Sequence, residues 1–431
     1  MKNLSDIDVL VIGSGPGGMA AALAAKENGA RQVVVIERDT EPGGILLQCI
    51  HNGFGMEIFK EDLPGPSYAQ RFVEQVYTAG IEFLLDAMVV DIFPTREVII
   101  ASKTLGYLTL KPKAIVLAMG CRERSRAQIQ LPGYRPNGVF TAGTAQRWVN
   151  MEGYMPGKRF VILGSGDIGM IMARRLTFEG AKVEKVLEIM PYISGLTRNY
   201  VQCLLDYDIP LQLKHTVKQI LGRDRVEAIE SVAVDENRQP IAGTEEITEC
   251  DTLLLSVGLI PENELSKKAG VVLDAKTSGP IVDQFFATNV PGFFAAGNVV
   301  HVYDLADWVT EAGYKAGKFA AEYARSAENL EGKTLPVTGG ENVRTVVPQQ
   351  VRMTGAKSGK ELEIEFQFRV PSPIEEPVKV VVLAGDQVIA SRNFPYARPG
   401  EMMDIKIKSG DIPAEAASLT VACLPKKRSN P

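Results

Sequence analysis

Two glycine-rich turns, each followed by a single acidic residue, carry the clearest chemistry in this sequence. The first turn, residues 13–18, reads Gly-Ser-Gly-Pro-Gly-Gly and follows the apolar run 9–12. Its first glycine makes a tight turn, its second lets backbone approach a pyrophosphate, and its last lets a helix pack against the strand. The start of that helix offers unpaired N–H groups to phosphate. Glu37, about 24 residues further on, stands where an acid accepts ribose hydroxyls.

A second turn of the same kind lies at residues 164–169. It reads Gly-Ser-Gly-Asp-Ile-Gly, follows the apolar run 160–163, and is followed at the end of the next apolar run by Glu188. One such turn is weak evidence, because glycine-rich turns are common. Two complete units of strand, turn, helix and terminal acid predict two bound dinucleotides in one chain.

Cys49 and His51 are the second candidates for chemistry. They follow Gly43-Gly44, a loop that we expect to pass close to a cofactor. A thiol at this place could be redox-active, with His51 lowering its pKa. The alternative is that Cys49 is a buried small apolar side chain. Cys121, directly after Gly120, is a weaker candidate for a redox role.

The cysteines give no metal or disulfide pattern. The five are scattered, odd in number and include no CxxC pair, which argues against a disulfide scaffold, an iron–sulfur site or a zinc site. We therefore predict no metal. The remaining three are expected to be packing residues: Cys203, Cys250 and Cys423.

The elements that position these residues alternate between strand and helix. This alternation predicts the α/β class with parallel sheets. The expected strands of this part are 9–12, 33–36, 81–85, 88–93, 97–101, 114–120, 160–163, 182–187, 252–261 and 288–296, and the expected helices are 19–28, 68–79, 170–178 and 308–325.

The pattern changes after a polar linker at 327–340. Glu363, Glu365 and Gln367 alternate with apolar residues, which is the period of a half-buried strand. Residues 384–387 read as a hairpin turn. We therefore predict an all-β, sandwich-like domain at 341–431, with strands at 343–347, 361–370, 378–383, 388–394, 402–407 and 418–423.

Composition limits the classes of function. The 431 residues are 45% hydrophobic and 23% charged, and the net charge is −5. This balance argues against a nucleic-acid surface and a polybasic membrane patch. No apolar run reaches the ~20 residues that span a bilayer, and residues 1–8 show no leader pattern. We expect a cytoplasmic protein that takes no nucleic acid and has no membrane span.

With these motifs in place, residues 1 to about 325 resemble the two-dinucleotide flavoprotein reductases of the pyridine nucleotide-disulfide oxidoreductase superfamily. The runs 117–120 and 256–261 look like its two connectors, and 294–298 looks like the segment that holds the FAD ribityl chain. The family usually has Asp where this chain has Asn298. The resemblance implies that the first turn binds FAD and the second binds NAD(P)H.

The span resembles the thioredoxin-reductase-like branch, in which the NAD unit is inserted into the FAD unit. This implies two Rossmann-like three-layer domains, with FAD bound by 1–120 plus 251–326 and NAD(H) bound by 121–250. The turns and the resemblance together give the expected cofactor-binding residues: Gly13, Gly15, Pro16, Gly17, Gly18, Glu37, Arg38, Gly43, Gly44, Ala118, Gly120, Gly164, Gly166, Asp167, Ile168, Gly169, Glu188, Gly258, Gly297, Asn298 and Ala306.

The flavin is expected to do the redox chemistry, while the protein supplies position and electrostatics. The resemblance implies that the helix starting near 305–308 points its N-terminus at the reduced flavin, whose charge a helix dipole stabilises. His301 and Tyr303, which follow Asn298, could line the same pocket.

Charge favours NADH over NADPH at the second site. A 2′-phosphate about 4 Å from Glu188 would cost roughly 4 kcal/mol per unit charge at an effective dielectric of 20. After Glu188 no Arg or Lys follows until Arg198. The alternative is that Glu188 is an ordinary solvated acid at the end of a strand.

More narrowly, residues 42–55 and 120–124 resemble bacterial flavoproteins encoded beside glycerol-3-phosphate-dehydrogenase-like FAD proteins, which are similar to NADH-linked subunits of amine and opine oxidase complexes. This implies an electron-transfer subunit whose partner is a second FAD-dependent dehydrogenase or an iron–sulfur protein. The alternatives are a self-contained NADH oxidase or single-cysteine peroxide or disulfide reductase that uses Cys49, and a module whose flavin is mainly structural. Homo-oligomerisation stays open.

Overall fold

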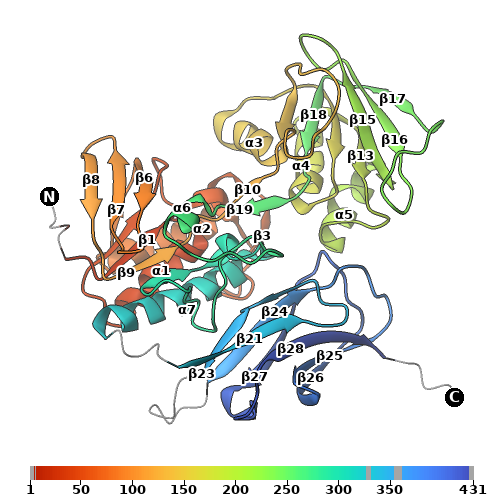
Figure 1. The fold of residues 1–431 in the computed structure, drawn as a ribbon. Coiled ribbons are helices and arrows are strands. Elements are labelled where there is room, and N and C mark those ends of the chain that lie inside the picture. Colours follow the sequence, from red (N-terminus) through yellow and green to blue (C-terminus); the bar gives the residue numbers. More distant parts are fainter. Residues whose placement is uncertain (1–3, 5, 327–331, 354–361, 427–431) are drawn as a thin grey trace. The chain divides into compact units, whose positions relative to one another are not determined.

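The computed structural model describes residues 4, 6–326, 332–353 and 362–426 (Figure 1). The chain divides into two compact units, Met1–Cys121 with Pro261–Pro431, and Arg122–Ile260. The second unit is therefore inserted into the first. The chain passes between them through β10 (Cys121–Glu123) and β19 (Leu259–Pro261), which pair as a two-stranded sheet.

The first unit is built on a five-stranded parallel sheet in the order β20-β9-β1-β2-β5. Four of these strands are buried along their whole length, as expected for a parallel sheet covered on both faces. Because the strands are parallel, their carboxyl ends lie along one edge. The strands are β1 (Val9–Ile12), β2 (Val33–Ile36), β5 (Glu82–Leu84), β9 (Ala114–Leu117) and β20 (Phe293–Ala295).

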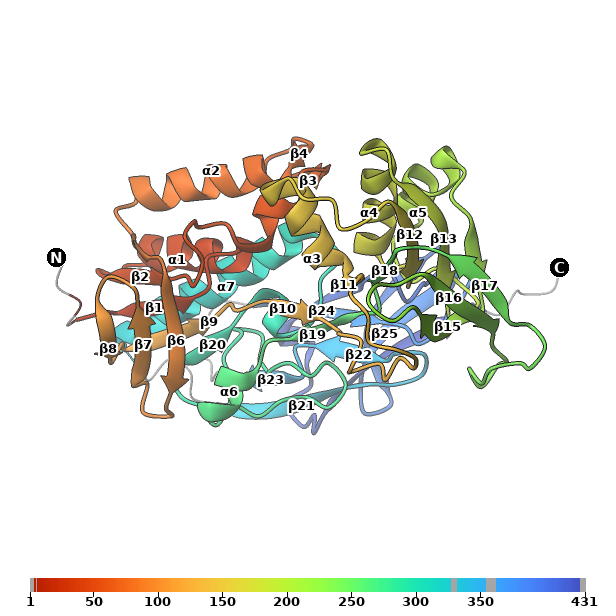
Figure 2. The ribbon, with the colours of Figure 1, turned by 90° about the horizontal axis from the view of Figure 1, so that it is seen from above.

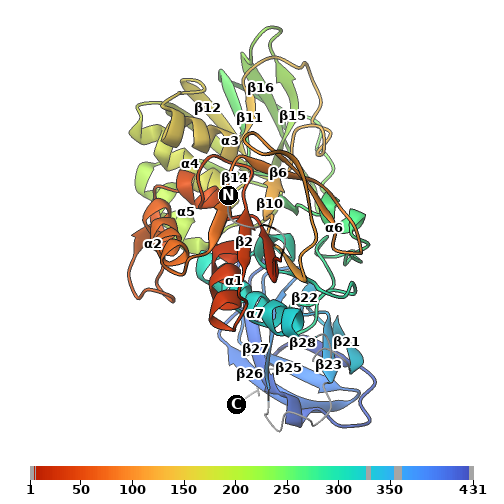
Figure 3. The same cartoon turned by 90° about the vertical axis from the view of Figure 1, so that its left-hand side faces the viewer.

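Helices α1 (Pro16–Glu27) and α7 (Ala306–Arg325) pack in close contact beside this sheet (Figure 3). Glycines on α7 permit the approach. A Cβ added at Gly313 or Gly317 would lie under 3.0 Å from backbone atoms of Gly17 or Ala21 on α1. The first half of α1 is thereby held against the middle of α7.

Further elements complete this part of the first unit. Figure 2 shows a separate antiparallel sheet, β6-β7-β8, beside the parallel one. Residues 106–110, which we did not predict as a strand, form its third strand. The elements are η1 (Gly44–Gln48), β3 (Asn52–Phe54), β4 (Leu63–Pro64), α2 (Gly65–Thr78), β6 (Ala87–Ile92), β7 (Val98–Ser102), β8 (Gly106–Leu110), α6 (Glu264–Lys268) and η4 (Gly297–Val299).

The inserted unit repeats the design with a parallel sheet in the order β11-β18-β12-β13-β14 and an antiparallel sheet β15-β16-β17. Its strands are β11 (Val139–Thr141), β12 (Arg159–Leu163), β13 (Lys182–Glu188), β14 (Leu211–Leu213), β15 (His215–Leu221), β16 (Ala228–Ala233), β17 (Glu246–Glu249) and β18 (Thr252–Leu255). Its helical segments are α3 (Ala142–Arg147), η2 (Trp148–Glu152), α4 (Asp167–Phe178), α5 (Thr197–Cys203) and η3 (Leu205–Tyr207).

The place where the chain returns to the first unit differs from the expected one. We assigned 251–260 to the FAD domain, but β18 pairs with β11 and β12 inside the inserted sheet. The unit therefore runs to Ile260 rather than to 250. An apolar strand that ends on glycine fits either sheet by its sequence, and only its pairing decides between them.

The C-terminal part contains two sheets, β23-β21-β28-β25-β26 and β22-β24-β27, which share one buried apolar core. The hairpin at 384–387 is confirmed by the pairing of Ala384 with Gln387. The strands are β21 (Lys333–Gly339), β22 (Thr345–Val347), β23 (Gln350–Met353), β24 (Glu363–Arg369), β25 (Val378–Ala384), β26 (Gln387–Phe394), β27 (Met403–Lys408) and β28 (Leu419–Pro425), with a short helix η7 (Ser409–Asp411).

The linker that we predicted at 327–340 is wrong in its second half. Residues 333–339 form β21, which pairs with β23 and β28. Its polar and glycine-containing sequence hides a strand, because residues such as Thr334 and Pro336 are exposed while Leu335 and Val337 are buried. Residues 1–3, 5, 327–331, 354–361 and 427–431 of our predicted domains and linker lie outside the described residues.

Candidate functional site

The first glycine turn forms a cradle at the carboxyl end of β1. Gly13 has a φ of 103°, and a Cβ added there would lie under 3.0 Å from the Ala118 carbonyl oxygen. A Cβ added at Gly18 would lie equally close to the carbonyl oxygen of Gly13. At Gly15, by contrast, nothing lies within 4 Å of the added Cβ. The turn is packed on its inner side and open at Gly15, where a pyrophosphate would approach.

The start of α1 suits this purpose. Gly15 is the N-cap and Pro16 the first residue, and no side chain caps the helix. Uncapped N–H groups and the helix dipole favour an anion. Gly44 packs against Gly15, since a Cβ on Gly44 would lie 3.0 Å from Gly15 Cα. The loop at Gly43-Gly44 therefore borders the cradle, and the open backbone at Gly15 leaves room for a dinucleotide.

A serine–glutamate pair locks the first turn to the end of β2. Glu37 is buried, and its Oε2 accepts hydrogen bonds from Ser14 N at 2.9 Å and Ser14 Oγ at 2.7 Å. Its Oε1 accepts from Asp39 N at 3.0 Å. A carboxylate has about four acceptor positions, so one position remains for a ribose hydroxyl. Arg38, the next residue, is exposed.

The second glycine turn has a cradle of similar construction. Gly164 has a φ of 101°, and a Cβ there would lie under 3.0 Å from Ser256 O. A Cβ at Gly169 would lie 2.7 Å from Ser256 Cβ, and Gly169 N donates to Ser256 Oγ at 3.1 Å. Gly166 is the uncapped N-cap of α4. Ser256, at the end of β18, takes the place that Ala118 has in the first unit.

The second acid is held in the same way, and more completely. Oε2 of Glu188 accepts from Ser165 N at 2.9 Å, Ser165 Oγ at 2.6 Å and Ser194 Oγ at 2.8 Å. Oε1 accepts from Met190 N at 2.9 Å. Glu188 is only 3% exposed, so it is not a solvated acid at a strand end. Four protein donors leave this carboxylate little capacity for another hydrogen bond.

The two serines that hold these acids were not among the residues predicted from the sequence. A signal was present, because Ser14 precedes Glu37 by 23 residues and Ser165 precedes Glu188 by 23 residues. Each serine also receives a backbone N–H from the loop after the second strand, Gly43 N at 3.2 Å and Ser194 N at 2.9 Å. The repeated spacing reflects one hydrogen-bonded lock that is used in both units.

The other residues expected at the second site lie on the first turn of α4. The carboxylate of Asp167 accepts from Leu196 N at 2.8 Å and Asn199 Nδ2 at 2.6 Å, while Ile168 is partly buried. Asp167 therefore holds the segment that follows β13. Gly258, in the return connector, has a φ of 97° that side chains rarely adopt.

Residues at the ends of β9 and β20 meet around Asn298. Its Oδ1 accepts from Tyr303 N at 3.0 Å, and its Nδ2 lies 3.6 Å from Cys121 Sγ as a donor. Gly120 and Gly297 both have positive φ, and Ala306 begins α7. The structure thus brings the first connector, the expected ribityl segment and the start of α7 to one edge of the first sheet.

Cys49 is buried at the end of η1, and burial raises the pKa of its thiol to about 12. Its Sγ lies 3.3 Å from the carbonyl oxygen of Ile45. His51 is partly exposed, with Nδ1 2.9 Å from the carbonyl oxygen of Asn52 and its ring against Phe54. A thiol in this environment stays protonated at neutral pH, and the thiolate is the reactive form.

His301 is fully buried beside Tyr303, with ring centroids 4.2 Å apart. Burial, helped by the nearby Arg369 charge, lowers the pKa of His301 from 6.5 to about 3. The Nε2 atom of His301 and the Tyr303 hydroxyl are buried without a hydrogen-bond partner among the described residues. His301 is therefore neutral at pH 7, and its surroundings are those of a side chain packed in the protein interior.

The free energy of unfolding should fall on acidification because of His301. The unfolded chain takes up a proton below pH 6.5, whereas the folded chain does so only near pH 3. This contribution to stability is present above pH 6.5 and is lost as the pH falls, by about 2 kcal/mol between pH 7 and pH 5. Urea unfolding at several pH values should show the slope for the native chain and lose it in His301→Gln. An unchanged slope in His301→Gln contradicts the assignment.

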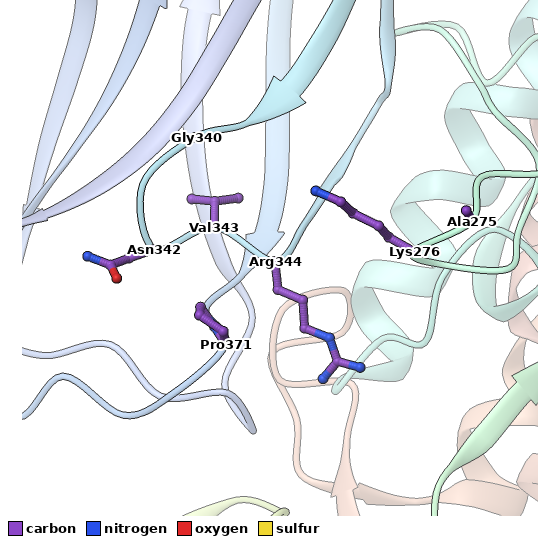
Figure 4. Close-up of a pocket in the computed structure, with 7 residues that line it drawn as sticks. All are labelled: Ala275, Lys276, Gly340, Asn342, Val343, Arg344 and Pro371. Carbon is purple, nitrogen blue, oxygen red and sulfur yellow. The ribbon is translucent and has the colours of Figure 1, made fainter.

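Away from these residues, an open pocket of about 570 Å³ lies between the 275–276 loop and the C-terminal sheets (Figure 4). Lys276 and Arg344, both exposed, contribute its charge, and none of the expected site residues lines it. We assign it no ligand. In the described ranges, no group of three or more His, Cys, Asp or Glu residues is placed to hold a metal, and no helix is long and apolar enough to cross a membrane.

The comparison with protein families identifies the class. Residues 7–316 match the family described as pyridine nucleotide-disulphide oxidoreductase. This match covers well over half of the chain, so the protein belongs to that family. It is an FAD-dependent oxidoreductase that uses a pyridine nucleotide, in agreement with its two cradles and with the resemblance found in the sequence.

Some of the proteins that are similar to this chain are named as subunits of enzymes. The chain is 28% identical over 319 residues to an opine oxidase subunit of Agrobacterium tumefaciens (strain Ach5), a match that covers 69% of this chain and 62% of that protein. It is 24% identical over 285 residues to the hydrogen cyanide synthase subunit HcnB of Pseudomonas protegens, covering 62% and 59%. The chain thus spans about three fifths of the length of these relatives.

The fold also has solved counterparts. Thioredoxin reductase of T. acidophilum superimposes with a TM-score of 0.61 at 23% identity, covering 74% of this chain and 99% of that one. At this identity the likeness concerns the fold alone. It confirms the predicted arrangement of two Rossmann-like units, and the strand-rich C-terminal part lies in addition to it.

Proposed function

We propose that this protein takes hydride from NADH onto FAD and passes the electrons to a separate redox protein. The observation that carries this proposal is the pair of equivalent cradles, each with an uncapped helix start and a locked acid. One chain that binds two dinucleotides is suited to exchange hydride between them. FAD, when bound, accepts a hydride and can release its electrons one at a time.

A partner acceptor is supported by what the chain contains. Its 431 residues include no CxxC pair that could receive electrons as a dithiol, and Cys49 is buried with a high pKa. The opine oxidase and hydrogen cyanide synthase relatives are by name subunits of assemblies. We infer a second FAD-dependent dehydrogenase or an iron–sulfur protein as the acceptor, in the cytoplasm.

The choice of NADH rests on Glu188. The locked carboxylate remains at the end of β13, where the adenine ribose would lie. Its acceptor positions are occupied by protein donors, so we propose that it acts mainly through its charge, which repels a 2′-phosphate. The relatives also include a protein named for the other nucleotide, the glutamate synthase [NADPH] small chain of Escherichia coli, 27% identical over 339 residues.

An anaerobic titration of the purified protein with NADH, followed by admission of air, tests the proposal. We expect one NADH to bleach one flavin, NADPH to be less effective, and air to restore the flavin slowly because the acceptor is a protein. If neither nucleotide bleaches the bound flavin, the proposed hydride path is wrong.

Cys49→Ser separates the proposal from a self-contained reductase. Because the Cys49 thiol is buried and protonated, we expect this variant to reduce and reoxidise like the native protein. The matched variant is Cys203→Ser, which removes another buried thiol. Fast reoxidation of the native flavin by air or peroxide that is lost only in Cys49→Ser would instead establish the single-cysteine alternative.

A further inference from the structure

Part of the polar face of β24 contacts the FAD-binding part of the first unit, whereas Glu363 at the beginning of the strand is exposed and pairs with Lys406. The apolar side chains of this strand enter the core of the C-terminal sheets. Its polar side chains lie on the other face, and two of them contact the FAD-binding part. Glu365 pairs with Lys315 at 2.6 Å, and Arg369 pairs with Asp304.

The pair Arg369–Asp304 is the most elaborate of these contacts. The side chains are only 20% and 10% exposed. Nη2 of Arg369 donates to Asp304 Oδ1 and, at 3.0 Å, to the carbonyl oxygen of Val302. The other carboxylate oxygen of Asp304 accepts from Met402 N at 2.6 Å. Both oxygens of Asp304 are therefore held by residues of the C-terminal part.

Asp304 belongs to the short loop that joins the expected ribityl segment to α7. The neighbouring Tyr303 donates its N–H to Asn298, and Ala306 is the first residue of the helix. A displacement of Asp304 would therefore move Asn298 and the start of α7 together. Arg369 is therefore connected to both of these elements through the loop that contains Asp304.

The order of the strands indicates which half of FAD, the adenosine half or the flavin half, would lie beside the loop that contains Asp304. Glu37 follows β2 on one side of β1, and the pyrophosphate cradle follows β1 itself. A ligand that runs along the carboxyl edge with its adenosine at Glu37 continues past the ends of β9 and β20. Asn298 follows β20, so the loop held by Asp304 faces the flavin half.

We propose that the C-terminal strand domain supports the loop that borders the flavin site, and that Arg369 is a positioning residue that acts through Asp304. The inference rests on FAD binding by the first unit and not on the identity of the electron acceptor. It gives the C-terminal domain a role within this chain: it fixes the loop 298–305 and the direction of α7.

The consequence for the cofactor can be measured in two quantities. A correctly placed loop lowers the dissociation constant for FAD. The positive end of α7 favours the reduced, more negative flavin over the oxidised one. When Arg369 is lost, the affinity for reduced FAD should therefore fall more than that for oxidised FAD, and each tenfold difference lowers the midpoint potential by about 30 mV for a two-electron couple.

The experiment uses the full chain, three single variants and the double variant that combines the first two of them. Arg369→Met removes the charge and the hydrogen-bond donors but keeps an unbranched apolar stem, and Asp304→Asn is the milder change at the partner. Arg392→Met is the matched control, because Arg392 pairs with Asp404 inside the C-terminal part and is half exposed. For each protein, the dissociation constant for FAD, the flavin midpoint potential and the urea midpoint of the apoprotein are measured.

We expect Arg369→Met and Asp304→Asn each to weaken the binding of oxidised FAD about tenfold. The binding of reduced FAD should weaken about tenfold more, which lowers the midpoint potential by about 30 mV. Arg392→Met should change neither quantity. The double variant should be no worse than Arg369→Met alone, since both changes break one pair. If Arg369→Met lowers only the urea midpoint and leaves the FAD constant and potential at native values, the proposal is overturned. These readouts need no acceptor, so a failure here leaves the proposed electron transfer standing.

Discussion

Replacing Gly18 with alanine is expected to abolish FAD binding and to destabilise the first unit. The added Cβ would lie under 3.0 Å from the carbonyl oxygen and carbon of Gly13, which are backbone atoms that cannot turn aside. Overpacking of this kind costs about 3 kcal/mol. Alanine improves helix propensity by only about 1 kcal/mol. The cost of the clash is larger, so the free energy of unfolding should fall. Urea unfolding of the apoprotein and the flavin content of the purified protein measure the two effects.

Gly15→Ala is the matched variant within the same turn. Gly15 has φ −66° and ψ −178°, which alanine adopts readily, and nothing lies within 4 Å of its added Cβ. The apoprotein should therefore keep its stability or gain up to about 1 kcal/mol. The methyl group would occupy the space where the pyrophosphate approaches, so FAD affinity should fall at least tenfold. Native FAD affinity in Gly15→Ala, or native stability in Gly18→Ala, would show that the cradle is assigned wrongly.

The second large effect concerns the choice of nucleotide. Glu188→Gln removes a negative charge from the end of β13 while keeping the shape of the side chain. At an effective dielectric of 20, unit charges 4 Å apart repel by about 4 kcal/mol. We therefore expect the preference for NADH over NADPH to fall about a hundredfold, or ~2.7 kcal/mol. Dissociation constants for both nucleotides, measured on the same preparation, give this ratio.

The ratio of the dissociation constants for NADPH and NADH separates the effect of the Glu188 charge from the effect of any damage to the glycine turn. Glutamine cannot accept from all four donors that Glu188 now satisfies, so both nucleotides should bind more weakly, but this loss is common to both. Glu236→Gln is the control, because it removes an exposed acid from the same unit. An unchanged ratio in Glu188→Gln would mean that Glu188 does not select the nucleotide.

Most of the fold could be predicted from the spacing of residues within short segments of the sequence. The positions of Gly13 and Gly164 follow from a turn that only glycine permits, and both have the positive φ that the turn requires. The alternation in 363–368 correctly placed Ile364 and Phe366 in a core. In each case the information lies within a few residues of the element that it describes, so the sequence pattern was sufficient.

Pairing between distant segments could not be predicted in the same way. The apolar run 252–260 reads as a buried strand but does not say which sheet it joins, and we placed it in the wrong unit. The alternation in β24 shows that one face is polar, yet not that Arg369 meets Asp304, 65 residues earlier in the chain. Such contacts are determined by the tertiary arrangement, which local periodicity does not encode.

The insertion of one unit into the other also fixes an order of assembly. The inserted unit is continuous from Arg122 to Ile260, whereas the parallel sheet of the first unit takes β1, β2, β5 and β9 from before it and β20 from after it. On the ribosome, this sheet therefore lacks its edge strand until Ala295 has been made, and the loop to be closed is long, which slows folding. The contacts between α1 and α7 can form only after α7 has emerged, by which time the inserted unit already has its whole sequence.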